Sequence, residues 1–224
     1  MCKLTNEQML RYFIFKDCGF DEEIAKKSYD FVMGNEQPEP QPENRPATEL
    51  ADGIYLMYGK TAVPYTGYEV SKDGKEGCTG IGVKFGGKSL VVVLNDISDD
   101  DIELTTQQGG TRFITNYHQA AEDMDGKAAT DDIRDILNMG IADDEHIPSL
   151  GELYFMLAHF TQINAALEAV GGEPLHDDWY WSSTQYSATY AWYLSLYYGS
   201  AGGYAQAAHQ RRVRPVSAFL PLNS

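Results

Sequence analysis

Residues 179–210 contain no Asp, Glu, Lys or Arg, although 22% of the whole chain is charged and its net charge is −16. This stretch holds all three tryptophans and seven of the 15 tyrosines, and most of the remainder is Ser, Thr, Ala and Gly. Tyr gives a large contact area at low entropic cost, and small residues adapt to a partner, as in antibody paratopes. An exposed patch of this kind usually marks an interaction site.

Apolar residues alternate with Tyr and Ser over residues 192–197, a period of two that is typical of a strand with one buried face. The inward set is Trp192, Leu194 and Leu196, and the outward set is Tyr193, Ser195 and Tyr197. We expect a loop over residues 199–203 and one or two further strands within residues 204–216, because Gly-rich and alternating patterns follow in turn.

Upstream, short apolar runs separated by Gly-rich turns predict strands over residues 54–58, 81–85 and 89–94. Helical spacing predicts one helix over residues 130–139, capped by Thr130, and a longer one over residues 149–170. In the second helix, Ser149 with Glu152 three residues later forms a capping-box pattern, and glycines follow the last apolar position. The mixture of strands and helices predicts an α+β fold.

The N-terminal part differs in composition. Residues 5–34 show the spacing of two short helices, and residues 35–47 (NEQPEPQPENRPA) form a Pro- and Glu-rich spacer without core-forming side chains. We therefore divide the chain into a small helical segment (1–34), a linker (35–51) and one ligand-binding domain (52–224).

Composition excludes several function classes. A pI near 4.5 argues against phosphate binding, and the cluster Arg211, Arg212 and Arg214 is too short for nucleic acid. No apolar stretch is long enough for membrane insertion, and no secretory signal pattern is visible, so we expect synthesis in the cytoplasm. Three cysteines without metal-ligand spacing predict no metal and no cofactor.

Several motifs carry a family resemblance. Tyr180-Trp181-Ser182-Ser183-Thr184, then Ala191-Trp192, Gly199 and Arg212-Val213-Arg214-Pro215-Val216 resemble the C-terminal signature of the C-type-lectin-fold variable proteins of diversity-generating retroelements, of the phage and gut-bacterial type. The segments 125–130 (DGKAAT) and 147–153 (IPSLGEL) also resemble that family. The resemblance covers residues 52–219. It implies a C-type-lectin-like domain. The N-terminal helical segment and the linker lie outside the resemblance, and we expect the helical segment to be a small appendage.

The resemblance implies a rigid scaffold that presents residues changed by adenine-directed mutagenesis, chiefly of Asn codons, from which Gln and Trp cannot arise. The implied scaffold residues are Trp181, Trp192, Arg212 and Arg214, with the arginines held by carboxylates or carbonyls. Leu can arise from such codons, so Leu194 and Leu196 are assigned to the scaffold by the alternation alone. The implied ligand-binding residues are Tyr186, Ser187, Thr189, Tyr190, Tyr193, Ser195, Tyr197, Tyr198, Ser200, Gly202, Gly203, Tyr204, Ala205, Ala207, Ala208 and His209. By the same codon argument, Gln206 and Gln210 are expected to be fixed.

The resulting hypothesis is a diversified receptor-binding protein, displayed on a virion or similar particle, whose partner is a host or bacterial surface protein or glycan. A homo-oligomer, such as a trimer, is implied by the resemblance alone. The alternative is a non-diversified bacterial adhesion or cell-envelope domain. An enzyme is not expected, because formylglycine-generating oxidases of related fold need a cysteine pair near the C-terminus and the cysteines here are at 2, 18 and 78.

The acidic run Asp99-Asp100-Asp101 lacks the spacing of an EF-hand loop and is expected to be a solvated loop. The tyrosines also have a plainer interpretation, since cross-strand stacking or an oligomer interface could account for them.

Overall fold

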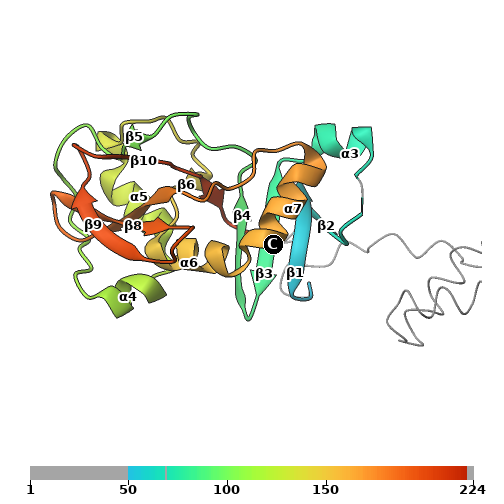
Figure 1. The fold of residues 1–224 in the computed structure, drawn as a ribbon, viewed down its shortest axis with the longest axis horizontal. Coiled ribbons are helices and arrows are strands. Elements are labelled where there is room, and N and C mark those ends of the chain that lie inside the picture. Colours follow the sequence, from blue (N-terminus) through green and yellow to red (C-terminus); the bar gives the residue numbers. More distant parts are fainter. Residues whose placement is uncertain (1–49, 69, 221–224) are drawn as a thin grey trace, which may run out of the picture. The chain divides into compact units, whose positions relative to one another are not determined.

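The computed structural model describes residues 50–68 and 70–220. The expected N-terminal helices and almost all of the expected linker lie outside the described residues. The described part is an α+β arrangement of antiparallel sheets and short helices (Figure 1). None of its helices combines the length and apolar character needed to cross a membrane.

A six-stranded sheet forms one half of the core. Its strands, in spatial order, are β2 (Thr61–Pro64), β1 (Gly53–Tyr58), β3 (Gly80–Phe85), β4 (Lys88–Val92), β11 (Val216–Ser217) and β6 (Glu145–His146). The three runs predicted from apolar patterning correspond to β1, β3 and β4, although β4 ends at Val92. Ile81, Val83 and Val92 are buried on this sheet, because alternate residues of its central strands face the helices.

The expected long helix is two helices. α6 (Leu150–Ala158) begins at the Ser149–Glu152 capping box, which the structure confirms, and α7 (Phe160–Val170) packs on β1 and β3 (Figure 1). Between them, His159 departs from helical geometry and its ring stacks on Phe85 at 3.9 Å. The break turns the apolar sides of the two helices toward different parts of the core. α7 then ends at Gly171, whose φ of 81° is the left-handed conformation that favours glycine.

The helix predicted over residues 130–139 begins earlier and ends sooner than expected. α5 (Gly126–Ile133) is capped by Asp125, whose side chain accepts the backbone N–H of Ala128, and a 3₁₀ turn η1 (Arg134–Ile136) follows. Thr130 is therefore not a cap. It is buried inside α5, where its hydroxyl donates to the carbonyl of Ile147 at 3.1 Å. Two shorter helices, α3 (Lys72–Gly77) and α4 (Tyr117–Glu122), complete the described set.

The charge-free stretch forms the sheet β7 (Trp179–Gln185), β8 (Tyr190–Ser195) and β9 (Ala201–Ala205). The expected loop over residues 199–203 is wrong in its position, because β9 already begins at Ala201 and the hairpin turn is shorter. β9 itself ends at Ala205. It is followed by β10 (Gln210–Arg211), which pairs with β5 (Ile102–Glu103), and by β11 of the large sheet, which begins at Val216.

Candidate binding surface

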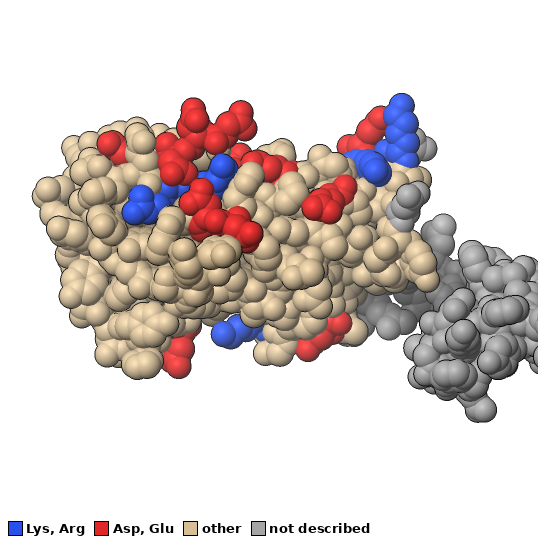
Figure 2. Space-filling view, viewed as in Figure 1, with Lys and Arg blue, Asp and Glu red and all other residues tan. Residues whose placement is uncertain are grey.

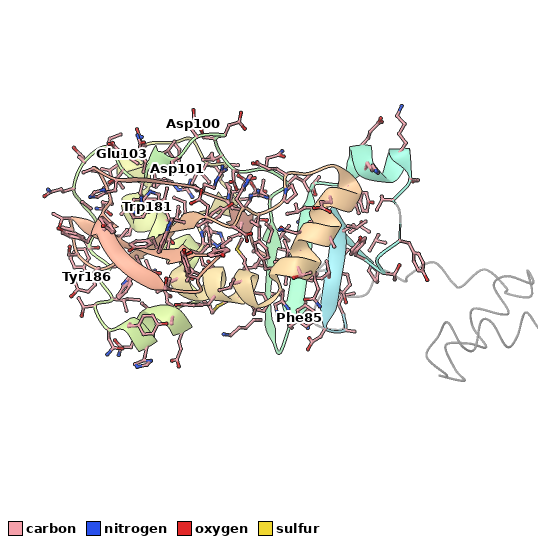
Figure 3. All side chains as sticks on the ribbon, viewed as in Figure 1. Phe85, Asp100, Asp101, Glu103, Trp181 and Tyr186 are labelled. Atoms are coloured by element: carbon pink, nitrogen blue, oxygen red, sulfur yellow. The ribbon has the colours of Figure 1, made fainter. Side chains whose placement is uncertain are left out.

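The charge-free sheet is anchored by large buried side chains. Trp181 is fully buried, and its indole N–H donates to the carbonyl of Ile102 at 2.9 Å (Figure 3). The indole N–H of Trp192 donates to the carbonyl of Ile114 at 2.7 Å. Leu194 is fully buried in the main core. Leu196 is also buried, although it lies in the turn after β8.

An ion-pair network fixes the C-terminal strand segment against the rest of the domain. The Arg214 and Asp96 side chains are both fully buried and joined through Nε and Oδ1. Arg212 donates to the other oxygen of Asp96 at 3.0 Å. Arg214 also donates to the carbonyls of Val93 and Glu173. Both arginines are thus held by carboxylates or carbonyls, as expected for a buried guanidinium.

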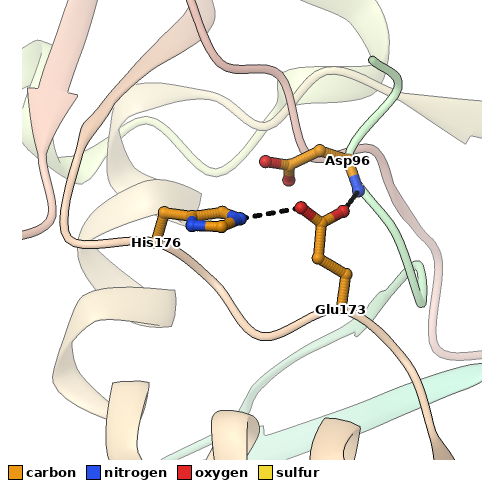
Figure 4. A group of neighbouring side chains, drawn as sticks. All are labelled: Asp96, Glu173 and His176. Atoms are coloured by element: carbon orange, nitrogen blue, oxygen red, sulfur yellow. Dashed lines mark hydrogen bonds and ion pairs between the residues drawn. The ribbon is translucent and has the colours of Figure 1, made fainter. Parts of the chain in front are cut away.

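Asp96, Glu173 and His176 bring potential ligand atoms within 4.8 Å of one another (Figure 4). His176 is hydrogen-bonded to Glu173 at 2.7 Å, and the backbone N–H of Asp96 donates to the other Glu173 oxygen. Burial alone would raise the pKa of Glu173, but these hydrogen bonds and the charge of Arg214 outweigh it and lower that pKa. The guanidinium groups of Arg212 and Arg214 also contact these carboxylates, so the cluster is part of the salt-bridge network.

Five tyrosines of the charge-free stretch are exposed on this anchored sheet. Their exposed fractions are 42% for Tyr186, 44% for Tyr190, 64% for Tyr197, 71% for Tyr198 and 39% for Tyr204. Figure 2 shows that the end of the domain carrying β8 and β9 presents a broad surface without charged side chains. The tyrosines of the charge-free stretch therefore form an accessible aromatic surface.

The aromatic residues divide between the two faces of the sheet, because alternate residues of a strand point to opposite sides. On one face, the ring of Tyr193 contacts those of Trp179 and Tyr204, with centroids 5.0 and 5.4 Å away. The Arg211 guanidinium lies over both Tyr193 and Tyr204 at 5.2 Å. This arrangement gives Arg211 a cation–π environment within the aromatic group.

On the other face, Trp192 contacts Tyr186 and Tyr117, with ring centroids 5.5 and 6.2 Å away. Tyr117 is exposed and its hydroxyl is 2.8 Å from that of Tyr154. Phe113 is also exposed, and its backbone forms an isolated β-bridge with Gln185 at the end of β7. Sequence reasoning missed Phe113 and Tyr117, since nothing in residues 109–117 signals a contact with a strand about 70 residues away.

The structure places the predicted ligand-binding residues at three levels of exposure. The exposed set is Tyr186, Tyr190, Tyr197, Tyr198, Ser200, Gly203, Tyr204, Ala208 and His209. The half-buried set is Ser187, Thr189, Tyr193, Gly202, Ala205 and Ala207. Ser195 is buried, so the expectation that it faces outward is wrong.

Ser195 is buried because it closes the β8–β9 turn. Its hydroxyl oxygen accepts the backbone N–H of Tyr198 at 3.0 Å, and its carbonyl accepts that of Gly199. Gly202 has a different constraint, since a Cβ atom there would press on the ring and hydroxyl of Tyr193. A side chain at position 202 therefore requires Tyr193 to move.

Two buried glutamines hydrogen-bond to each other and to the loops beneath this surface. Gln185 donates to the side-chain oxygen of Gln206 at 2.9 Å and to the carbonyl of Gly109 at 3.0 Å. Gln206 donates to the carbonyl of Ala188 at 2.9 Å. This placement agrees with a fixed role for Gln206, whereas Gln210 is exposed.

Acidic side chains gather beside the aromatic surface (Figure 2). Asp100, Asp101 and Glu103 lie in and just before β5, which pairs with β10 (Figure 3). Burial raises the pKa of Asp101, as do the nearby Asp178 and Asp100 charges, against the opposite effect of the arginines. The surface thus has an uncharged centre and an acidic border on this side.

No family model matches the sequence, and no curated protein matches it significantly. A fimbrial protein from Bacteroides ovatus is a distant structural neighbour, with 16% identity and a TM-score of 0.48. The match covers 75% of this chain and 49% of that protein, so this chain spans about half the length of its neighbour. A likeness this weak carries no functional argument.

Proposed function

We propose that this chain is a binding protein that presents a diversifiable aromatic surface on a C-type-lectin-like scaffold. The observation that carries the proposal is the difference in burial between side chains of the same charge-free stretch. Tyr180, Trp181 and Leu194 are fully buried, whereas Tyr197 and Tyr198 are more than 60% exposed without any charged neighbour in residues 179–210. Tyr anchors surrounded by small residues are the usual composition of a protein contact centre.

The division between changing and fixed positions supports diversification. Most positions that adenine-directed mutagenesis could reach are exposed or half-buried, and Gln206 and Trp192, which it could not produce, are buried. Ser195 and Gln210 depart from this division, as do Leu194 and Leu196, which are buried although the same codons could produce Leu. The proposed target is a protein or glycan on a host or bacterial surface, reached from a virion or similar particle.

The proposal assigns no catalytic role. His209 is the histidine nearest to the surface tyrosines, and its ring packs edge-on against Tyr204 at 4.4 Å. Within the described ranges, no hydrogen bond joins its side chain to a carboxylate or hydroxyl group. A general base needs such contact with the proton that it removes or with a group that orients it.

Binding is tested on arrays of glycans and purified bacterial surface proteins with the full chain as probe. Replacing Tyr197, Tyr198 and Tyr204 singly with Ala should each weaken binding by about 30-fold where the residue is a hot spot, or about 2 kcal/mol. Tyr68→Ala is the matched control, because Tyr68 is 79% exposed and lies outside the charge-free stretch. Full binding by all three variants would place the ligand elsewhere.

Diversification is tested separately by sequencing the same locus in related isolates. Substitutions confined to adenine-derived codons after Gln185, beside a reverse-transcriptase gene and a near-repeat, would support it. Substitutions scattered evenly over the domain would instead favour the alternative of a bacterial adhesion domain with a fixed surface.

A further inference from the structure

The sheet that carries the aromatic surface has one open edge. β9 pairs with β8, and no other strand in the described part of the chain pairs with its second side. The opposite edge, β7, is covered by other segments, because the backbone of Tyr180 forms a β-bridge with Arg212 and that of Gln185 forms one with Phe113. Figure 1 shows β9 as the outermost strand of this sheet. The two edges therefore differ in what they offer to another chain.

The register decides which backbone groups of β9 point outward. At the two ends of the hairpin, Ser195 N–H donates to Ser200 at 3.0 Å and Gln206 N–H donates to Thr189 at 3.1 Å. Hydrogen-bonded pairs alternate along an antiparallel ladder. The even-numbered residues of β9 therefore turn their N–H and C=O groups toward β8, and the odd-numbered residues turn theirs away.

The outward residues are Ala201, Gly203 and Ala205. The carbonyl of Ala205 already accepts the N–H groups of Ala208 and His209. The free groups are thus both polar groups of Ala201, both of Gly203 and the N–H of Ala205. They match the pattern with which the next strand of a sheet would pair.

This edge lacks the features that normally prevent pairing. Protected edges carry Lys, Pro, a bulge or an inward charge. β9 reads Ala-Gly-Gly-Tyr-Ala, its register with β8 is regular, and Gly203 is exposed without a side chain to shield its backbone. The backbone is accessible on the same strand that holds the proposed contact residues.

Aromatic side chains flank the edge on both faces of the sheet. Tyr204 lies on one face with Tyr193, and Tyr186 lies on the other, near the position that a Cβ atom of Gly203 would take. Side chains of an added strand alternate between the two faces. They would therefore meet an aromatic group on each face, which supplies specificity in addition to backbone pairing.

We propose that the ligand is an extended segment of a partner protein, which adds to β9 as the fourth strand of this sheet. The inference rests on the proposed function and narrows its ligand from a protein or glycan to a peptide chain. The net charge of −16 and the acidic border favour a neutral or basic segment, and they oppose pairing with a second copy.

The probe is a linear peptide of about ten residues, the upper range of ordinary strand length, selected from a displayed random library against the full chain. The strongest peptide is synthesised in three forms: unmodified, N-methylated at odd positions, and N-methylated at even positions. Methylation removes donors from one edge of the peptide and leaves its side chains unchanged. One methylated form should lose binding and the other should keep it.

The matched protein variants are Gly203→Pro and Gly203→Ala. Proline removes the outward N–H and is tolerated on an edge strand, whereas alanine keeps it and meets only ordinary contacts, at 3.9 Å or more. Gly203→Ala keeps the outward N–H and so measures the effect of an added methyl group alone. Gly203→Pro should bind the peptide about tenfold more weakly than Gly203→Ala, with an unchanged circular dichroism spectrum and an unchanged oligomeric state.

Equal binding by the two variants, or equal effects of the two methylation patterns, would overturn the inference. Recovery of no peptide from the library would do the same. A natural chain that dimerises, and a Gly203→Pro variant that does not, would assign the edge to a second copy. If Tyr198→Ala abolishes binding to an array target while Gly203→Pro does not, the proposed function stands and the strand-addition mode fails.

Discussion

Replacing Asp96 with Asn tests the network that holds the scaffold. One carboxylate oxygen of Asp96 accepts the Nε–H of Arg214, and the other accepts Arg212 at 3.0 Å and the hydroxyl of Tyr180 at 3.1 Å. Asn has nearly the same shape but carries no charge and turns an N–H₂ group toward one guanidinium. The fully buried Arg214 would lose its contacting counter-ion.

Removing one partner of a buried ion pair costs about 3–5 kcal/mol, because the other charge stays buried without compensation. Glu173 remains 3.9 Å from Arg214, so we expect a loss near the lower end, about 3 kcal/mol. That is a large part of the roughly 5–15 kcal/mol that stabilises a typical domain.

Urea denaturation, followed by tryptophan fluorescence, measures the free energy of unfolding of each variant. The control is Lys127→Met, which removes a 2.7 Å ion pair with the half-exposed Asp131 and should cost less than about 0.5 kcal/mol. A loss below about 1 kcal/mol for Asp96→Asn would refute the reasoning, since the network would then contribute no more than a surface pair.

Four further measurements test the structure. The pKa of Glu173 is lowered in the folded state, so the contribution of its carboxylate to stability is complete above the ordinary value of 4.5 and is lost as the pH falls through the folded-state pKa. In acid denaturation, the difference in stability between the natural chain and Glu173→Gln should therefore shrink below about pH 4.5. Trp181→Ala should cost about 3–5 kcal/mol in urea unfolding, and a loss under about 1 kcal/mol would contradict its burial. Burial raises the pKa of the Cys78 thiol, so peptide mapping should find Cys78 labelled by iodoacetamide only after unfolding. Gly110→Ala should lower the melting temperature, because Gly110 has a φ of 90° and an added Cβ would meet the Gln185 side chain; an unchanged melting temperature would show that the loop relaxes.

Local patterns in the sequence were sufficient to predict several helices and strands. The capping box at Ser149 specifies a helix start because its hydrogen bonds lie within four residues. Apolar patterning located β1, β3 and β4 for a similar reason, since alternation along one strand is a local property. The break at His159 had no such signal. The His159 ring stacks on Phe85, which lies on another element, and such a contact cannot be seen in the local sequence.

The same limit applies to the candidate surface. Composition alone identified the charge-free, tyrosine-rich stretch, and the alternation correctly placed Trp192 and Leu194 inside. It failed at Ser195, because a turn hydrogen bond rather than strand periodicity decides where that hydroxyl points. The contribution of Tyr117 was invisible in sequence, since only folding brings it against Trp192.

The sequence by itself determined that this chain carries a large uncharged aromatic surface on a domain with short strands and capped helices, because composition and local hydrogen bonding are properties of neighbouring residues. Only the tertiary structure decided that Asp96 neutralises an arginine 118 positions away and that one edge of the aromatic sheet stays unpaired. Both depend on which distant segments pack together, and that choice is made by burial and pairing over the whole domain.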